Sequence, residues 1–495
     1  MLGPVRWPPP RDLFRTRLEG VTLAHIAIVG GGIAGRAAAL FLARRAHTVT
    51  VFDHEHPWPT GDIDRDFFDW RRPRTPQAIQ PHGLLAPVRS VLRREAPDVY
   101  AAMLRMGAHE HRELDWFVPP PPARAGDDDL VTVRARRIVL ERALSDAVAS
   151  DERIDVRHGE PVRAVTFAHG GDVPRVTGVR TAAGGVGADL VLNAGGRRSA
   201  VGDWLVEAGC RPPVVENHAV GIAYFSRWYR VRPGGPANPG RVWDISIAPF
   251  AIGLVFPSDN DVFAVTVALP VGDPTRATLR DPAVFDSVAR LFPACRAWLA
   301  LDHEAVGDVQ VMAGLDNRWT ALVDERGPVV TGLVNVGDSF IHTNPTLGQG
   351  AALALLAAQR VATTYDGAAG FERDYHDWAV RTLKPWFDHQ VTIDRGDEAF
   401  LSGAFDPHAQ PPPLDDAARA QFAATPCALE DPVVMRARAQ VRHLVLTPDQ
   451  AFGTPEVREH LGRWLARHPE FPSMPPGPSR ADWEALTGDP AAVMS

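Results

Sequence analysis

The sequence is short of cysteine and has no long apolar run. Its three cysteines, Cys210, Cys295 and Cys427, lie far apart and form no CxxC pair, which excludes a disulfide framework and a zinc site of the usual spacing. No stretch approaches the ~18 consecutive apolar residues that a membrane-spanning helix requires, so we expect no membrane span. These absences together predict a protein of the reducing cytoplasm.

Lysine is almost absent, since Lys384 is the only one among 52 basic residues. Chemistry that needs a lysine therefore has a single candidate. The net charge is −8 and we find no basic stripe, which argues against a nucleic-acid partner. The rest of the composition is globular, with 45% hydrophobic and 23% charged residues over 495 positions, a length typical of about two to four folding units.

The apolar periodicity predicts an α/β fold in which a Rossmann-like domain is interrupted by antiparallel strands. Short β-branched runs at 25–30, 48–52 and 189–194 are typical of a buried parallel sheet, whereas residues 221–269 alternate and are rich in aromatic residues. We therefore predict a Rossmann-like domain at 24–213 and 311–366, an inserted antiparallel β domain at 214–310, and a mostly helical C-terminal region at 367–495. Between Trp58 and His82 no period is sustained, and we expect a long loop there.

A glycine motif follows the first predicted strand and opens a helix. It consists of Gly30, Gly32, Ile33, Ala34 and Gly35 in the stretch GGGIAG. The first glycine permits a tight turn, the second lets a pyrophosphate approach the backbone, and the third lets the helix pack closely on the strand. Asp53 ends the next strand about 20 residues later, where a carboxylate can accept hydrogen bonds from an adenosine ribose. This combination predicts a dinucleotide site.

A second motif lies far downstream, in VVTGLVNVGDSFIHTNPTLGQGAAL at 329–353. Gly337 and Asp338 follow a strand, and an aspartate there can hold polyol hydroxyls. Pro345, Gly348 and Gly350 then lead into an Ala-rich helix, whose N-terminal amides can stabilise a group that becomes negative, as the N1/C2 edge of a reduced flavin does. Two nucleotide-type sites of different design imply one long dinucleotide, FAD.

GGGIAG with Asp53, the Gly337-Asp338 pair and PTLGQG, in this order, resemble the FAD-dependent monooxygenase superfamily. The resemblance is to the p-hydroxybenzoate hydroxylase-like (group A) enzymes, which have a GR2-type Rossmann domain, and it covers Ile26 to about Thr364. Within it, Arg137 looks like the helix arginine that approaches the FAD pyrophosphate.

The segment RPRTPQAIQPH, residues 72–82, resembles the part of bacterial polyketide epoxidases of this superfamily that passes near the isoalloxazine. Gln77 belongs to this segment. Arg72 either reaches the FAD phosphates or an anionic substrate, or belongs to a surface cluster of arginines.

The resemblance implies an activity. In the family, reduced FAD adds O2 at C4a, and the resulting C4a-hydroperoxyflavin gives one oxygen atom to a small hydrophobic substrate by hydroxylation or epoxidation, often in secondary metabolism. Alternation in GIAYFSRWYRV places Tyr224, Ser226 and Trp228 on one face of a strand, where they line the substrate site or take part in ordinary sheet packing. We name no catalytic acid or base. Two histidine pairs, at 54/56 and 109/111, lack a spaced third ligand, so we predict no metal site.

The source of electrons is left open by one departure from the family pattern. Family members carry an Asp-Gly pair linked to NAD(P)H, but the matching segment NAGGRRS has Gly195 in place of the aspartate. Electrons therefore come from NAD(P)H at a transient surface site or from a partner flavin reductase. The alternatives are an FAD-dependent dehydrogenase or reductase, a flavin-binding sensor, and a flavin-dependent halogenase. Halogenation is disfavoured because WxWxIP is absent and Lys384 lies outside the matched region.

Overall fold

A five-stranded parallel sheet forms the centre of the first lobe, in the order β19-β9-β1-β2-β5. The computed structural model describes residues 23–55, 58–168, 170–401, 416–469, 471 and 477–488. The strands are β1 (His25–Val29), β2 (Thr48–Asp53), β5 (Ile154–His158), β9 (Leu190–Asn193) and β19 (Leu333–Asn335). The apolar side chains of β1, β2, β9 and β19 are buried on both faces of the sheet, as is typical of parallel strands, whereas those of the edge strand β5 are half-buried. The predicted α/β fold with a Rossmann-like domain is confirmed.

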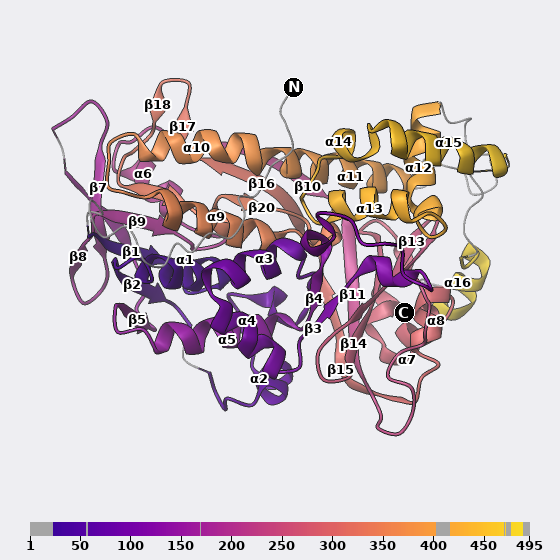
Figure 1. Ribbon diagram of the computed structural model, residues 1–495. Helices are drawn as coiled ribbons and strands as arrows, with labels where there is room; N and C mark the ends of the chain where they lie inside the picture. The colour runs from indigo at the N-terminus through magenta and orange to yellow at the C-terminus, as the bar shows by residue number, and fades with distance from the viewer. Residues whose placement is uncertain are drawn as a thin grey trace.

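Helices cover one face of this sheet and a small meander covers the other (Figure 1). The first face packs against α1 (Ile33–Ala43), α5 (Arg137–Ala149) and α9 (Gly350–Thr364), with α3 (Ala86–Glu95) and α4 (Pro97–Arg105) outside them. The second face packs against β6 (Ala164–Ala168), β7 (Arg175–Arg180), β8 (Gly185–Gly187) and α6 (Val201–Glu207). Strand β19 pairs with β9 although some 140 residues separate them, so the second lobe is inserted between these two strands.

The second lobe is built on a five-stranded antiparallel sheet in the order β12-β13-β14-β11-β15. The strands are β11 (Ile222–Val231), β12 (Ile245–Ala248), β13 (Ala251–Pro257), β14 (Val262–Pro270) and β15 (His303–Met312). One face, which carries Phe225, Tyr229 and Phe263, is covered by α7 (Pro282–Ala289), α8 (Pro293–Trp298) and α16 (Arg480–Thr487). The opposite face, with Tyr224 and Ile252, looks toward the first lobe and the C-terminal helices.

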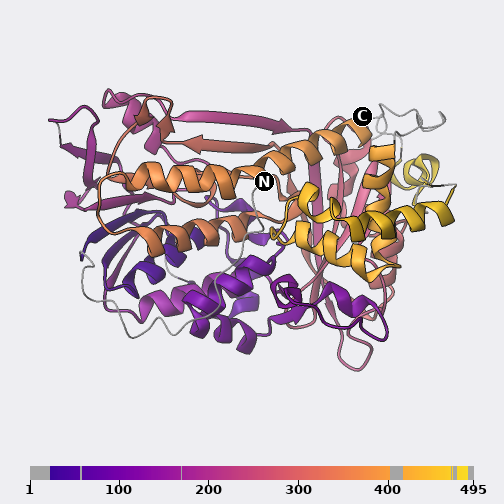
Figure 2. The same ribbon diagram turned by 45° about the horizontal axis from the view of Figure 1, so that its top comes forward.

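A third, narrow sheet joins the two lobes. It pairs β10 (Val214–Val220) with β16 (Leu315–Ala321) and β16 with β20 (Ile341–His342), and its two long strands run side by side between the lobes (Figure 2). Strand β10 therefore does not belong to the inserted antiparallel sheet, and residue 310, where we expected that domain to end, lies inside β15.

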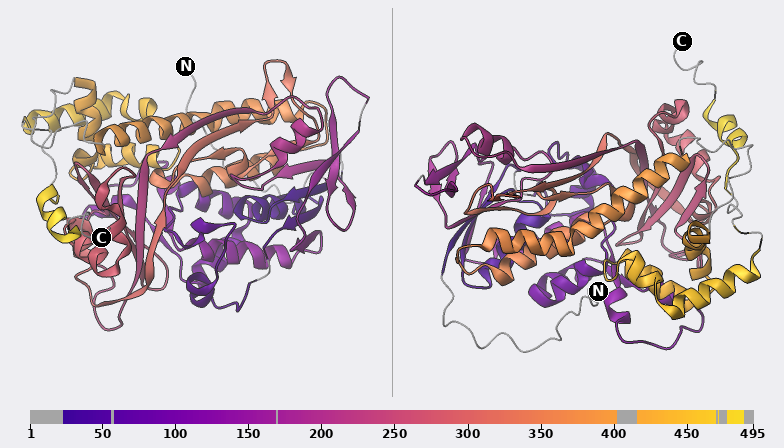
Figure 3. Two further views of the ribbon diagram at one scale, coloured as in Figure 1. Left: turned by 180° about the vertical axis from the view of Figure 1, so that it is seen from behind. Right: turned by 90° about the horizontal axis from the view of Figure 1, so that it is seen from above.

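The C-terminal region is helical, as predicted. Helices α10 (Phe371–Thr382) and α11 (Lys384–Leu401) run along the first lobe and the narrow sheet. Helices α12 (Asp416–Ala428), α13 (Pro432–Arg442), α14 (Pro448–Phe452) and α15 (Pro455–Arg467) pack together beside the antiparallel sheet (Figure 3). None of the helices in the described ranges is both long and apolar enough to cross a membrane.

The expected loop between Trp58 and His82 contains a helix, so that prediction was wrong in part. Helix α2 (Ile63–Asp69) begins where the Asp62 side chain accepts a hydrogen bond from the amide of Arg65, and a 3-10 turn, η1 (Pro76–Ile79), follows. The ring of Phe67 packs edge-on against Trp228 of β11, with 5.1 Å between the ring centroids. A partner from the other lobe thus stabilises a helix that its own composition does not predict.

Candidate cofactor and substrate site

The glycine turn between β1 and α1 leaves room for a ligand at one position only. Gly30 has a φ of +109°, and an added Cβ at Gly30 or Gly35 would overlap backbone oxygens. At Gly32 an added Cβ would meet no atom within 4 Å. Gly32 is also the N-cap of α1, which has no side-chain cap and no acidic residue in its first turn. The open space at Gly32 therefore fits the pyrophosphate of a dinucleotide.

Asp53 lies at the tip of β2 and is already engaged by the protein. One carboxylate oxygen accepts a hydrogen bond from Arg36 at 2.9 Å, and the other accepts the amide of Glu55 at 3.1 Å. A carboxylate has about four acceptor positions, so capacity for ribose hydroxyls remains. The motif did not reveal Arg36, which follows the last glycine and is buried.

Gly337 and Asp338 lie against the start of α1. Gly337 has a φ of +64°, and an added Cβ would lie 2.6 Å from the Cβ of Ala34. Nδ1 of His342 lies 3.4 Å from the Asp338 carboxylate. Burial opposes the charge of Asp338, but the His342 ring and the nearby cation Arg137 lower its pKa below the usual range. The segment Gly337-Asp338 thus places a carboxylate next to a residue that contacts the glycine motif at Ala34.

Arg137 begins α5 and points toward the same region. It donates to Oε1 of Glu141 at 2.8 Å and to Nε2 of His82 at 3.3 Å. Nδ1 of His82 lies 2.8 Å from the carbonyl oxygen of Gln80, so the neutral ring donates there and accepts from Arg137. Burial and the Arg137 charge lower the pKa of His82 to about 4, which keeps the ring neutral at physiological pH.

Arg72 is linked to two of the predicted cofactor residues through its carboxylate partners, because the amide of Glu55 donates to Asp53 and Glu141 also binds Arg137. The Arg72 guanidinium contacts two carboxylates, Glu55 at 2.6 Å and Glu141 at 2.5 Å, and its side chain is 7% exposed. Because two anions already compensate this cation, it holds the 70–76 segment onto α5. Gln77 lies in η1 and is half-buried.

The second glycine motif approaches the segment that contains His82. A Cβ added to Gly83 would lie 3.4 Å from the Cα of Gly348, so the two loops pass each other closely. Oε1 of Gln349 has no hydrogen-bond partner in the described structure although the residue is 2% exposed. Gln349 is the N-cap of α9, which has no side-chain cap. A buried orphan acceptor beside an uncapped helix N-terminus fits the polar edge of a flavin.

A cavity of about 1560 Å³ begins at these two loops. Its lining includes His82 to Leu85, Pro345 to Gln349, and residues of β12 to β14 on the antiparallel sheet. Residues of α11, α12, α13, α14 and α15 complete the wall, so the C-terminal helices help to enclose it.

Of the predicted substrate residues, Tyr224 lines this cavity and the other two do not. Its hydroxyl lies 2.6 Å from Oγ1 of Thr346 in the second glycine motif and accepts from Asn344 at 3.0 Å. Ser226 pairs with Thr266 within the sheet at 2.8 Å. The indole N–H of Trp228 donates to the carbonyl oxygen of Ile79 at 2.7 Å, so that side chain joins the two lobes.

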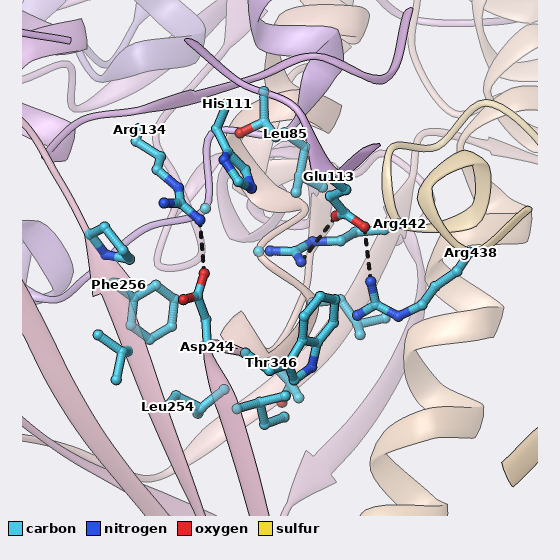
Figure 4. A pocket seen from close by; sticks show the side chains of 18 of the residues that line it. Leu85, His111, Glu113, Arg134, Asp244, Leu254, Phe256, Thr346, Arg438 and Arg442 are labelled. Carbon is cyan, nitrogen blue, oxygen red and sulfur yellow. Dashed lines mark hydrogen bonds and ion pairs between the residues drawn. The ribbon is translucent and has the colours of Figure 1, made fainter. Parts of the chain in front are cut away.

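Charged side chains gather at one end of the cavity (Figure 4). Arg134, at the end of β4 (Thr132–Arg134), donates to Asp244 at 2.8 Å. Glu113, in the 3-10 turn η2 (Glu113–Trp116), contacts Arg438 at 2.9 Å and Arg442 at 3.1 Å. Burial disfavours the charge of Glu113, but these two arginines hold its pKa well below the usual range.

The predicted residues thus form a continuous path rather than one cluster. It runs from the glycine turn through Asp338, Arg137 and His82 to the loop at Gly348, where the cavity begins. Residues 28–66 match the family described as NAD(P)-binding Rossmann-like domain. Together with the inserted antiparallel sheet, this arrangement is the fold of solved FAD-dependent monooxygenases.

Individual proteins of similar fold have distant sequences. PqsL from Pseudomonas aeruginosa, a probable FAD-dependent monooxygenase, aligns with a TM-score of 0.55 at 17% identity, covering 78% of this chain and 100% of its own. p-Nitrophenol 4-monooxygenase PnpA from Pseudomonas putida aligns with a TM-score of 0.57 at 16% identity over 86% of this chain and 98% of its own. The flavin-dependent halogenase CmlS aligns with a TM-score of 0.55 at 16% identity over 91% of this chain and 78% of its own.

A closer relative in sequence is Protein Rv3254 from Mycobacterium tuberculosis. It is 24% identical over 360 residues, which cover 68% of this chain and 71% of that protein. The fold is shared by monooxygenases and halogenases alike, so the choice between these activities depends on the residues of the site.

Proposed function

We propose that this protein is an FAD-dependent monooxygenase that inserts one atom of O2 into a hydrophobic small molecule by hydroxylation or epoxidation. The observation that carries the proposal is the continuous path from the open space at Gly32 to the loop at Gly348, with a large cavity at its far end. Bound FAD would supply the oxygen activation. In this proposal the electrons come from NAD(P)H or from a partner flavin reductase. The protein acts in the cytoplasm, and its product belongs to secondary metabolism.

Each part of the chain has a task in this proposal. The α1 N-terminus at Gly32 holds the pyrophosphate, Asp53 the ribose, and Asp338 the polyol chain. The amides at the start of α9, with the orphan oxygen of Gln349, hold the flavin edge, and Gly83 and Gly348 let the two loops close on the ring. The antiparallel sheet and the C-terminal helices exclude water from the substrate.

Halogenation is the less favoured alternative because the one lysine lies away from the cavity. Nζ of Lys384 contacts Asp388 at 2.6 Å and Glu216 at 3.1 Å, and Lys384 is not part of the cavity lining. In the resembling halogenases a lysine near the substrate guides hypohalous acid, and this chain has no other lysine.

The cofactor is tested with a single methyl group. Gly32→Ala adds a Cβ to open space at an extended backbone position, φ −73° and ψ −171°, so the fold should tolerate it with a change in stability within about 1 kcal/mol. The same methyl occupies the pyrophosphate position, and we expect FAD affinity to fall about tenfold or more. Flavin fluorescence during FAD titration measures it.

The matched control is Gly462→Ala in α15, where an added Cβ also meets no atom within 4 Å. FAD affinity should not change in this variant. A wild-type protein that takes up no FAD, or a Gly32→Ala variant that binds FAD as tightly as the wild type, would refute the proposed cofactor site.

The reaction class is tested by measuring whether turnover requires O2 and whether oxygen enters the product. The FAD-loaded protein is mixed with NADH or NADPH without oxygen, with and without a flavin reductase, and flavin bleaching is followed. Oxygen is then admitted with a panel of hydrophobic substrates under labelled O2. A monooxygenase gives a product with one labelled oxygen, whereas turnover that proceeds without oxygen would identify a dehydrogenase or reductase instead.

A further inference from the structure

We propose that the substrate is a carboxylic acid with an apolar body, and that Arg134 and Arg442 bind its carboxylate at the charged end of the cavity. This inference rests on the proposed function, because it assigns the substrate class of the same site.

The cavity has two chemically different sides. Leu254, Phe256 and Thr346 lie on one side, and Arg134, Glu113 and the two arginines of α13 lie on the other, with Leu85 beside Glu113 and Asp244 between the two sides (Figure 4). The apolar side includes the loop beside Gly348, where the flavin edge is proposed to lie. A substrate anchored by a charged group at the far side would thus place its apolar body toward the reacting end.

The charges at this end do not cancel. Three arginines face two carboxylates, so the cluster of Arg134, Arg438, Arg442, Asp244 and Glu113 has one positive charge in excess. His111 beside it adds none, because burial and the neighbouring Arg134 lower its pKa to about 3.

The other charged residues of the lining do not compensate the cluster. Five of them are exposed, as Arg442 itself is, and none of the five forms an ion pair with the cluster in the described structure, namely Asp115, Arg241, Asp261, Asp449 and Arg458. The remaining one, Asp397, lies on α11 on the wall near Tyr224 and forms no ion pair with the cluster in the described structure. The lining as a whole holds five arginines and six carboxylates, so the positive excess is local to the cluster, and an anion is favoured there rather than elsewhere in the cavity.

Two of the three arginines have donors to spare. Among the described residues, Arg134 makes one side-chain hydrogen bond, to Asp244, and Arg442 makes one ion pair, to Glu113, with 48% of the Arg442 side chain exposed. Burial lowers the pKa of Arg134 and the positive charge of Arg442 lowers it further, so the attraction of Asp244 does not fully compensate this cation. A guanidinium carries five N–H donors in a planar fork that suits a carboxylate.

The third arginine has a structural task. The guanidinium of Arg438 lies over the Trp243 ring, 4.6 Å from its centroid, and binds the buried Glu113. It thereby holds α13 against η2. Glu113 contacts Arg442 on the side away from Leu254 and Thr346 (Figure 4). The remaining N–H groups of the Arg442 guanidinium are therefore free for a ligand.

The test compares an acid with its neutral isostere. 2-Naphthoate and 2-naphthamide are titrated into the FAD-loaded protein by isothermal calorimetry. We expect the acid to bind about tenfold tighter or more than the amide. Arg442→Gln should remove most of this difference and leave the affinity for the amide unchanged, and Arg134→Gln should do the same.

Controls separate charge recognition from loss of fold. Arg463→Gln, in α15, removes an arginine that is 59% exposed and outside the cavity lining, and should leave both affinities unchanged. If Arg134→Gln fails to fold because Asp244 is left unpaired, Arg134→Gln with Asp244→Asn removes both charges, and Arg442→Gln still tests the proposal.

Equal affinities of acid and amide, no binding of either, or an equal loss in Arg463→Gln would overturn the carboxylate site. FAD affinity is measured separately on the same samples. A protein that discriminates the acid in the absence of FAD, yet never takes up FAD, would uphold the carboxylate site and refute the monooxygenase proposal.

Discussion

Asp397 offers a test of the cavity wall that needs no substrate. It lies on α11, lines the cavity, and forms no hydrogen bond or ion pair within the described residues. Burial, with the nearby carboxylate of Asp394, raises its pKa from 3.8 to about 6. At pH 8 the folded protein therefore keeps an uncompensated carboxylate partly out of water. Replacing it by the isosteric asparagine should stabilise the protein.

The magnitude follows from the two pKa values. One pH unit between the folded and unfolded pKa corresponds to about 1.4 kcal/mol, so ionised Asp397 costs at most ~3 kcal/mol, and residual contact with water reduces this to ~1–3 kcal/mol. The sign follows from the raised pKa. The stability that protonated Asp397 contributes is fully present below the ordinary aspartate pKa and is lost as the pH rises through about 6.

Thermal melts of Asp397→Asn and the wild type at several pH values measure the effect. We expect the variant to melt a few degrees higher at pH 8 and the difference to shrink toward pH 4. Asp449→Asn is the control, because Asp449 lines the same cavity but is exposed. A variant less stable than the wild type at pH 8, or a difference that does not change with pH, would refute the assignment of Asp397 as a buried, uncompensated acid.

Three further predictions concern the scaffold. Gly35→Ala should abolish soluble folded protein, measured by expression yield and circular dichroism, because its Cβ would overlap the carbonyl oxygen of Gly30. Glu113→Gln should lower the free energy of unfolding by ~3 kcal/mol at pH 7, measured by urea denaturation, and the difference should be lost at acid pH because the Glu113 pKa is depressed. Trp228→Phe should cost ~1 kcal/mol in the same assay through loss of the hydrogen bond to Ile79, while a variant as stable as the wild type would contradict that role.

Local motifs explain which parts of the fold were predictable. Gly30, Gly32 and Gly35 lie within six residues of one another, and the turn they form depends on contacts between β1, α1 and β9 that recur wherever the motif follows a buried strand. The alternation of β11 was equally readable, because side chains of a strand alternate between faces whatever surrounds them.

The same strand shows where prediction stopped. Alternation placed Tyr224, Ser226 and Trp228 on one face, but Phe67 and the backbone of η1 cover Trp228, and Thr266 pairs with Ser226. These partners come from other elements, so no local pattern in the sequence of β11 predicts them. Helix α2 was missed for the same reason.

The sequence alone determined the α/β class, the position of both glycine motifs and the scarcity of lysine and cysteine, because each depends on neighbouring residues or on composition. Only the tertiary structure decided the shape and charge of the cavity. Glu113 and Arg442 lie 329 positions apart in the sequence, and Arg134 and Asp244 lie 110 positions apart. Such pairs form when the lobes and the C-terminal helices pack, so their meeting is a property of the assembled fold rather than of any segment.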